Sequence, residues 1–145
     1  MAELRFDDLP LDLAFTDVRG DGARVLALFG DPQDPYTRRL VRDELTQVED
    51  LTVHTLLLPL EIYPGSDDLA RRIWAAPDRA AAWYRWMLEE IPPEQEADPH
   101  APIARLRLAA EELRVLSTPT LVFPGGEMMA GATPAPEIER LLSGR

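Results

Sequence analysis

Two apolar runs separated by a helix-like segment constrain the fold of this chain most strongly. The first run, Arg24 to Phe29, is ended by a Gly-Asp-Pro turn, and the second, Leu51 to Leu58, is ended by a proline. Such runs without polar alternation are typical of strands buried on both faces of a sheet. The segment between them has roughly helical spacing of apolar residues up to about Gln47. Strand, helix and strand with short joints predict a βαβ unit with parallel strands and a right-handed crossover.

The helix between the two runs has a recognisable start. Asp34 suits the N-cap position, where a carboxylate accepts hydrogen bonds from free backbone N–H groups, and Pro35 suits the first helical position. An aspartate there also complements the positive end of the helix dipole, and such a cap contributes roughly 0.5–2 kcal/mol. We therefore expect Asp34 to act first of all as a helix cap.

The remaining segments extend this unit in both directions. Residues 1–13 are expected to form a lead-in segment with a helical turn, and residues 66–115 a helical insertion. The expected elements are an extended piece at Ala14–Val18, helices at about Ser66–Ala76, Asp78–Glu90, Ala101–Leu113 and Pro134–Leu142, and a hairpin of Thr120–Phe123 with Met128–Ala130. The order βαβ, insertion, ββα predicts one α/β domain over residues 1–145, with a thioredoxin-like fold around a central mixed sheet.

The net charge of the chain limits the classes of partner that it is expected to bind. It has 26 acidic and 15 basic residues, a net charge of −11, which repels phosphate backbones and anionic lipid headgroups. We therefore expect no nucleic-acid partner and no membrane insertion, since no apolar run approaches the length of a spanning helix either. The start, Met1–Asp8, lacks a basic region followed by an apolar stretch, so no signal peptide is recognised in this chain.

The chain contains no cysteine. A thiolate is the nucleophile in disulfide exchange, and no other side chain forms a mixed disulfide. Thiol–disulfide oxidoreductase or isomerase activity is therefore not expected. The missing cysteines also remove the usual indication of redox compartment.

An Asp-Pro turn at a strand end and a Thr-Pro-Thr segment indicate a known family. The chain resembles the catalytic domain of bacterial periplasmic disulfide isomerases of the DsbC/DsbG type over nearly its whole length. In that family an Asp-Pro turn precedes a C-x-Tyr-C motif at a helix start, and a cis-proline segment faces it. The stretches that carry the resemblance are Leu9–Leu11, Val18–Gly22, Phe29–Leu40, Ile73–Trp83, Ser117–Phe123 and Gly131–Leu142.

This sequence also differs from the family pattern at positions that bear on function. Asp34 and Thr37 occupy the positions of the two redox cysteines, so the motif Asp34-Pro35-Tyr36-Thr37 is degenerate and no catalytic residue is assigned. The N-terminal dimerisation domain of the family does not precede the match in this chain, and the resemblance therefore implies no oligomeric state. The resemblance implies a periplasmic location, which the sequence itself leaves open.

The resemblance implies a cis bond between Thr118 and Pro119. In the family, the residue before this proline offers its backbone to an extended substrate strand, which is a form of β-augmentation. Because this step needs no sulfur, peptide binding can persist after catalysis is lost. We expect a peptide-binding cleft between the degenerate motif and Thr118–Pro119, with Tyr36 beside it.

Other chemistry is poorly supported. A metal site drawn from Asp21, Asp31 and Asp34 would lack sulfur ligands, and the two histidines, His54 and His100, lie elsewhere in the sequence. We expect no metal and no cofactor. The aromatic residues of the insertion are expected to pack mainly in the core; they are Trp74, Trp83, Tyr84 and Trp86.

Three hypotheses follow for function. The first is a redox-inactive, protein- or peptide-binding or chaperone-like module that uses the cleft. The second is an enzyme that reuses the site for non-redox chemistry with Asp34 as acid or base. The third is a structural subunit of an envelope assembly. The sequence leaves the identity of the partner open.

Overall fold

The computed structural model describes residues 5–144, in which five strands form one mixed sheet in the order β1-β3-β2-β4-β5. The strands are β1 (Phe15–Val18), β2 (Arg24–Gly30), β3 (Leu51–Leu57), β4 (Thr120–Val122) and β5 (Met128–Ala130). β2 and β3 pair in parallel, which confirms the predicted βαβ unit, and the other neighbouring pairs are antiparallel. The first four residues of the predicted lead-in lie outside the described residues; the rest of it forms two short 3-10 turns, Phe6–Asp8 and Leu11–Leu13.

The predicted helix after β2 is present but not regular. It begins as α1 (Pro35–Arg39), widens into a π-helical turn (Leu40–Glu44) and ends in a 3-10 turn (Leu45–Gln47). The helical segment therefore extends to Gln47 as the sequence predicts, while its winding changes along its length. The backbone N–H of Leu45 donates to the carbonyl of Leu40, five residues earlier, and both side chains are buried. The wide turn thus directs both leucines into the core.

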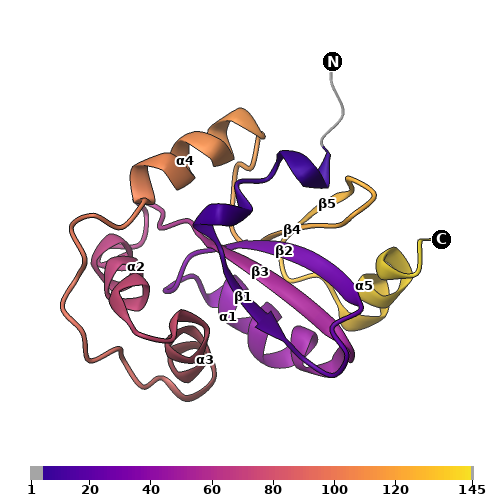
Figure 1. Ribbon diagram of the computed structural model, residues 1–145, viewed down its shortest axis with the longest axis horizontal. Helices are drawn as coiled ribbons and strands as arrows, with labels where there is room; N and C mark the ends of the chain where they lie inside the picture. Colours follow the sequence, from indigo (N-terminus) through magenta and orange to yellow (C-terminus); the bar gives the residue numbers. More distant parts are fainter. Residues whose placement is uncertain (1–4, 145) are drawn as a thin grey trace.

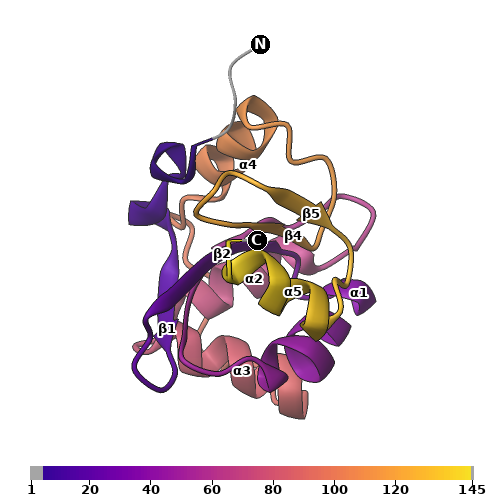
Figure 2. The ribbon, with the colours of Figure 1, turned by 90° about the vertical axis from the view of Figure 1, so that its right-hand side faces the viewer.

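Four further helices are found where the sequence predicts them, with each end within two residues of its predicted position. They are α2 (Ser66–Ala75), α3 (Arg79–Glu89), α4 (Ile103–Glu112) and α5 (Ala135–Leu142). In both ribbon views α4 lies above the sheet and α1 below it, and Figure 2 shows α5 on the same side as α1 (Figures 1 and 2). Within residues 5–144, no helix has the length and apolar character needed to cross a bilayer.

The core is centred on β2 and β3 and extends to the insertion. Trp83 on α3 is fully buried and its ring lies 5.9 Å from that of Phe15 on β1. The other aromatic residues of the insertion are only half-buried, so the expected cluster lies partly at the surface; they are Trp74, Tyr84 and Trp86. The guanidinium of Arg79 stacks 3.7 Å above the Trp74 ring. One face of that indole is therefore covered by a cation rather than by core.

Candidate functional site

Asp34 caps α1, as the sequence predicts. Its Oδ1 accepts a hydrogen bond from the backbone N–H of Tyr36 at 3.0 Å. The hydroxyl of Thr37, one turn into the helix, donates to Oδ2 at 2.7 Å. The aspartate is only 1% exposed, which the sequence does not indicate, because N-cap residues usually lie at the surface. The two residues that the resemblance places at the redox-cysteine positions are therefore bonded to each other inside the protein.

Two distant segments complete the environment of Asp34. The phenol of Tyr63 donates to Oδ1 at 3.1 Å, and the hydroxyl of Thr118 donates to Oδ2 at 2.8 Å. Each carboxylate oxygen thus accepts two hydrogen bonds, which matches the roughly four acceptor sites of an ionised carboxylate. Sequence reasoning missed Tyr63, which follows β3 in a proline- and glycine-containing loop without periodic pattern.

Asp31, which precedes α1 by one turn, is a second buried carboxylate that accepts several hydrogen bonds. It is fully buried, and its carboxylate accepts hydrogen bonds from the Gln33 N–H at 2.7 Å, the Leu60 N–H at 2.6 Å and the Ser66 hydroxyl at 2.6 Å. Burial raises the pKa of Asp31 above its ordinary value of 3.8, and these three hydrogen bonds counteract part of that effect. The loop after β3 is therefore anchored to Asp31 through Leu60 and Ser66, which places Tyr63 beside Asp34.

Gly30 at the end of β2 permits this close packing. A Cβ at this position would lie 2.9 Å from Cγ2 of Thr37 and 3.2 Å from the ring of Trp83. Any side chain here would therefore separate the strand from the start of α1 and from α3. The nearby Trp86 joins the same region, since its indole N–H donates to the Pro32 carbonyl at 2.6 Å.

The Thr118–Pro119 bond is cis, as the resemblance implies, and both residues are buried. The Thr118 side chain is bonded to Asp34, whereas its backbone N–H and C=O have no hydrogen-bond partner among residues 5–144. Tyr36, in contrast, is 56% exposed, and Pro35 is also exposed. The structure therefore brings Asp34, Thr37 and Thr118 together in the interior and leaves Tyr36 at the surface beside them.

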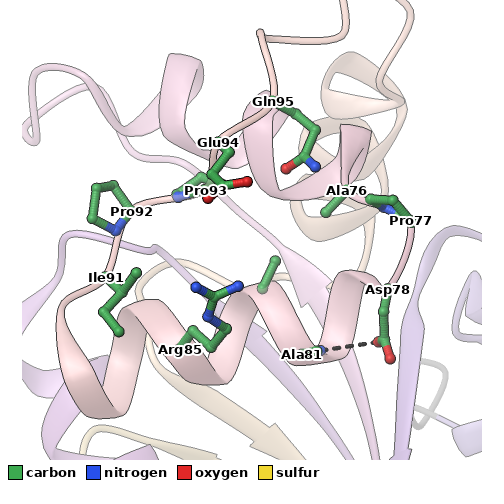
Figure 3. A pocket seen from close by; sticks show the side chains of 11 residues that line it. Ala76, Pro77, Asp78, Ala81, Arg85, Ile91, Pro92, Pro93, Glu94 and Gln95 are labelled. Carbon is green, nitrogen blue, oxygen red and sulfur yellow. Dashed lines mark hydrogen bonds between the residues drawn. The ribbon is translucent and has the colours of Figure 1, made fainter.

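Two pockets of the described chain can be compared with this site. One adjoins the degenerate motif and is lined by Gln33, Asp34, Pro35, Tyr36, Arg38, Arg39 and Arg42. The other lies in the insertion, between α3 and the loop that follows it, and Figure 3 shows the Arg85 side chain projecting toward that loop. Asp34 and its four hydrogen-bond donors do not line the insertion pocket, so only the first pocket belongs to the predicted site.

The residues considered for metal binding are engaged in local contacts. Asp21 accepts a hydrogen bond from the Ala23 N–H in its turn, and His54 Nδ1 lies 2.8 Å from the Thr16 hydroxyl. Burial lowers the pKa of His54. Across the described part of the chain, no three histidine, cysteine, aspartate or glutamate side chains are grouped to hold a metal ion.

The strand order, the capped helix after β2 and the cis-proline segment facing it define a thioredoxin-like domain. The family model described as a thioredoxin-like domain matches residues 11–144. The catalytic domain of ScsC from Proteus mirabilis shares this fold, with a TM-score of 0.75 at 19% identity, over 95% of this chain and 92% of that one.

Closer relatives are disulfide interchange proteins. The chain is 39% identical over 143 residues to the probable thiol:disulfide interchange protein DsbC of Bordetella parapertussis, covering 98% of this chain and 50% of that protein. The chain thus spans about half the length of such curated relatives. A disulfide interchange protein from Neisseria gonorrhoeae superposes with a TM-score of 0.87 at 34% identity, over 94% of this chain and 97% of that chain. The chain therefore belongs to the thioredoxin-like family, as a DsbC-like member without cysteine.

Proposed function

We propose that this chain is a redox-inactive, peptide-binding or chaperone-like module that holds extended polypeptide segments against Thr118 and Tyr36. The observation that carries the proposal is the state of Asp34: its carboxylate is buried and fully hydrogen-bonded within the chain. The former reactive position is thereby closed to chemistry, while the surface beside it stays available. A periplasmic location and the organisation of residues 1–145 as one domain are part of the same proposal.

The geometry at Asp34 argues against the acid–base alternative. A general acid or base must come within hydrogen-bond reach of the proton that it transfers. The carboxylate of Asp34 is already occupied by Tyr36, Thr37, Tyr63 and Thr118, and its residue is 1% exposed. A substrate would have to displace at least one of these buried donors, which would then lack a partner.

Two features support binding of an extended segment. The free N–H and C=O of Thr118 match the pairing needs of an extended backbone, as in other cases of β-augmentation. Tyr36, placed near this backbone by the contact between Asp34 and Thr118, provides a large exposed aromatic surface. Aromatic side chains contribute strongly to interfaces because they bury a large area with little conformational freedom lost.

The test is binding of fluorescein-labelled extended peptides with alternating apolar side chains, measured by fluorescence polarisation. We expect Tyr36→Ser to weaken binding about fivefold or more, since it removes an aromatic contact. Leu108→Ser is the matched control, because Leu108 is 57% exposed on α4, on the opposite side of the sheet from α1 (Figures 1 and 2). The proposal fails if no extended peptide binds, or if both substitutions have the same effect.

A further inference from the structure

An arginine-rich pocket lies beside the degenerate motif of an otherwise strongly acidic chain. Three of its seven lining residues are arginines, namely Arg38, Arg39 and Arg42, and its one carboxylate, Asp34, is buried. Arg42 follows Arg39 by three positions and Arg38 by four, so its side chain neighbours both on the surface of the helical segment. The net charge of the whole chain is −11, so this local excess of cations is opposite in sign to its surroundings.

The three arginines differ in the contacts that their guanidinium groups make with other residues of the chain. Arg38 lies 5.0 Å above the Trp86 ring and 3.2 Å from the Glu90 carboxylate, so it supports the wall of the pocket. Arg42 pairs at 2.8 Å with the adjacent Asp43, and both side chains are about half exposed. Arg39 is exposed and has no ion pair or hydrogen bond from its side chain among residues 5–144.

Two arginines of α2, Arg71 and Arg72, have a structural role, with which Arg39 can be compared. Arg72 donates to the carbonyls of Gln95 and Pro93, and Arg71 donates to Asp67 and to the carbonyls of Asp98 and Pro99. The hydrogen bonds of those two guanidinium groups fix the loop of residues 93–99. Arg39 makes no such hydrogen bond within the described chain, its charge acts on Asp43 only at a distance, and it lines a pocket together with an exposed tyrosine.

We propose that the segment bound at Thr118 and Tyr36 carries an acidic side chain, which this pocket binds through Arg39 and Arg42. This inference rests on the proposed peptide-binding function and adds its selectivity. Asp34 lines the pocket and contacts Thr118, so the pocket adjoins the free backbone that would receive the segment. A planar guanidinium presents paired donors that match the two oxygens of a carboxylate.

The occupant is an acidic polypeptide segment rather than a polyanion. A nucleic acid would carry charge along its whole length and would meet the repulsion of the −11 chain beyond this pocket. A single acidic side chain within an otherwise apolar segment meets a local group of three arginines, of which two already pair with Glu90 and Asp43 and Arg39 does not. Screening over about 8 Å at physiological salt limits the influence of more distant carboxylates.

The experiment compares two labelled peptides that are identical except for two adjacent residues, Glu-Glu in one and Gln-Gln in the other. Fluorescence polarisation with the full chain should show the glutamate peptide binding about fivefold more tightly, the upper range for exposed charge pairs. Arg39→Gln should reduce this preference to less than twofold and leave affinity for the glutamine peptide unchanged within twofold. Circular dichroism of the variant verifies that it remains folded.

Arg105→Gln is the matched control. Arg105 is an exposed arginine on α4, across the sheet from α1, so its removal changes the net charge equally without touching the pocket. Equal affinity for the two peptides, or equal loss of preference in both variants, would overturn the acidic selectivity and leave peptide binding intact. Failure of both peptides to bind would overturn the proposed function and this inference together.

Discussion

The Asp34 site and the loop of the insertion are held by charges of opposite sign. In the first, one buried carboxylate collects hydrogen bonds from its own helix, from Tyr63 and from Thr118. In the second, Arg71 and Arg72 on α2 donate to backbone carbonyls of residues 93–99. Each device joins segments that no sheet or helix hydrogen bond connects.

The Asp34 site and the loop of residues 93–99 differ in how easily water reaches their hydrogen-bonding groups. Asp34 is 1% exposed, so water cannot replace it as an acceptor when it is removed. The hydrogen bonds of Arg71 and Arg72 to the loop are part-buried or exposed, and of the four acceptor residues only Pro93 is buried, so water can hydrate most of these carbonyls if an arginine is lost. A buried polar group left without a partner costs more than one that becomes hydrated. Removal of the buried anion should therefore destabilise the fold more than removal of either guanidinium.

The largest expected effect is that of Asp34→Ala. We expect the free energy of unfolding to fall by about 3–5 kcal/mol, because the substitution leaves several buried donors without an acceptor. The matched control is Asp78→Ala, since Asp78 caps α3 through the Ala81 N–H at 3.0 Å but is exposed. That change should cost about 0.5–2 kcal/mol. Urea unfolding of both variants measures the difference, and equal losses would contradict the role of burial.

An intermediate effect is expected for Asp31→Asn. The amide would place an NH₂ group against either the Leu60 N–H or the donors from Gln33 and Ser66, which should cost about 1–3 kcal/mol at neutral pH.

The same variant should also change the pH dependence of stability. The pKa of Asp31 is raised by burial, so the folded protein holds this proton more tightly than the unfolded chain does. The contribution of this bound proton to the free energy of unfolding is complete below pH 3.8, the ordinary pKa of an aspartate. It is lost as the pH rises through the raised pKa of Asp31. Unfolding free energies of the native protein, measured from acid toward neutral pH, should therefore fall relative to those of Asp31→Asn. A constant difference between the two profiles would contradict the raised pKa.

The smallest effect is expected for Arg72→Ala. Loss of its hydrogen bonds to Gln95 and Pro93, at 2.9 and 2.8 Å, should cost about 1–2 kcal/mol. Amide hydrogen exchange should accelerate in residues 93–99 while β2 and β3 stay protected. Arg85→Ala, which removes an exposed arginine beside the same loop, should change stability by less than about 0.5 kcal/mol. Equal exchange in the two variants would show that the loop does not depend on Arg72.

Elements governed by neighbouring residues were predictable from the sequence. The Asp34 cap followed from the residue type and Pro35, and the strands β2 and β3 followed from their continuous apolar runs. The π-helical turn at Leu40–Glu44 was not predictable, because several helical windings would satisfy the same apolar spacing. Only packing against the sheet selects the one that buries both Leu40 and Leu45.

The sequence by itself determined that the chain lacks a thiol and that an aspartate, Asp34, precedes the helix at the position where the resemblance places a reactive cysteine. It did so because capping and thiol chemistry depend on the residue present and its immediate neighbours. Tertiary structure alone decided that this aspartate is buried and bonded to Tyr63 and Thr118, which are 29 and 84 positions away. Those contacts exist because β3 and β4 both pair with β2 and bring their following and preceding loops to one end of the sheet.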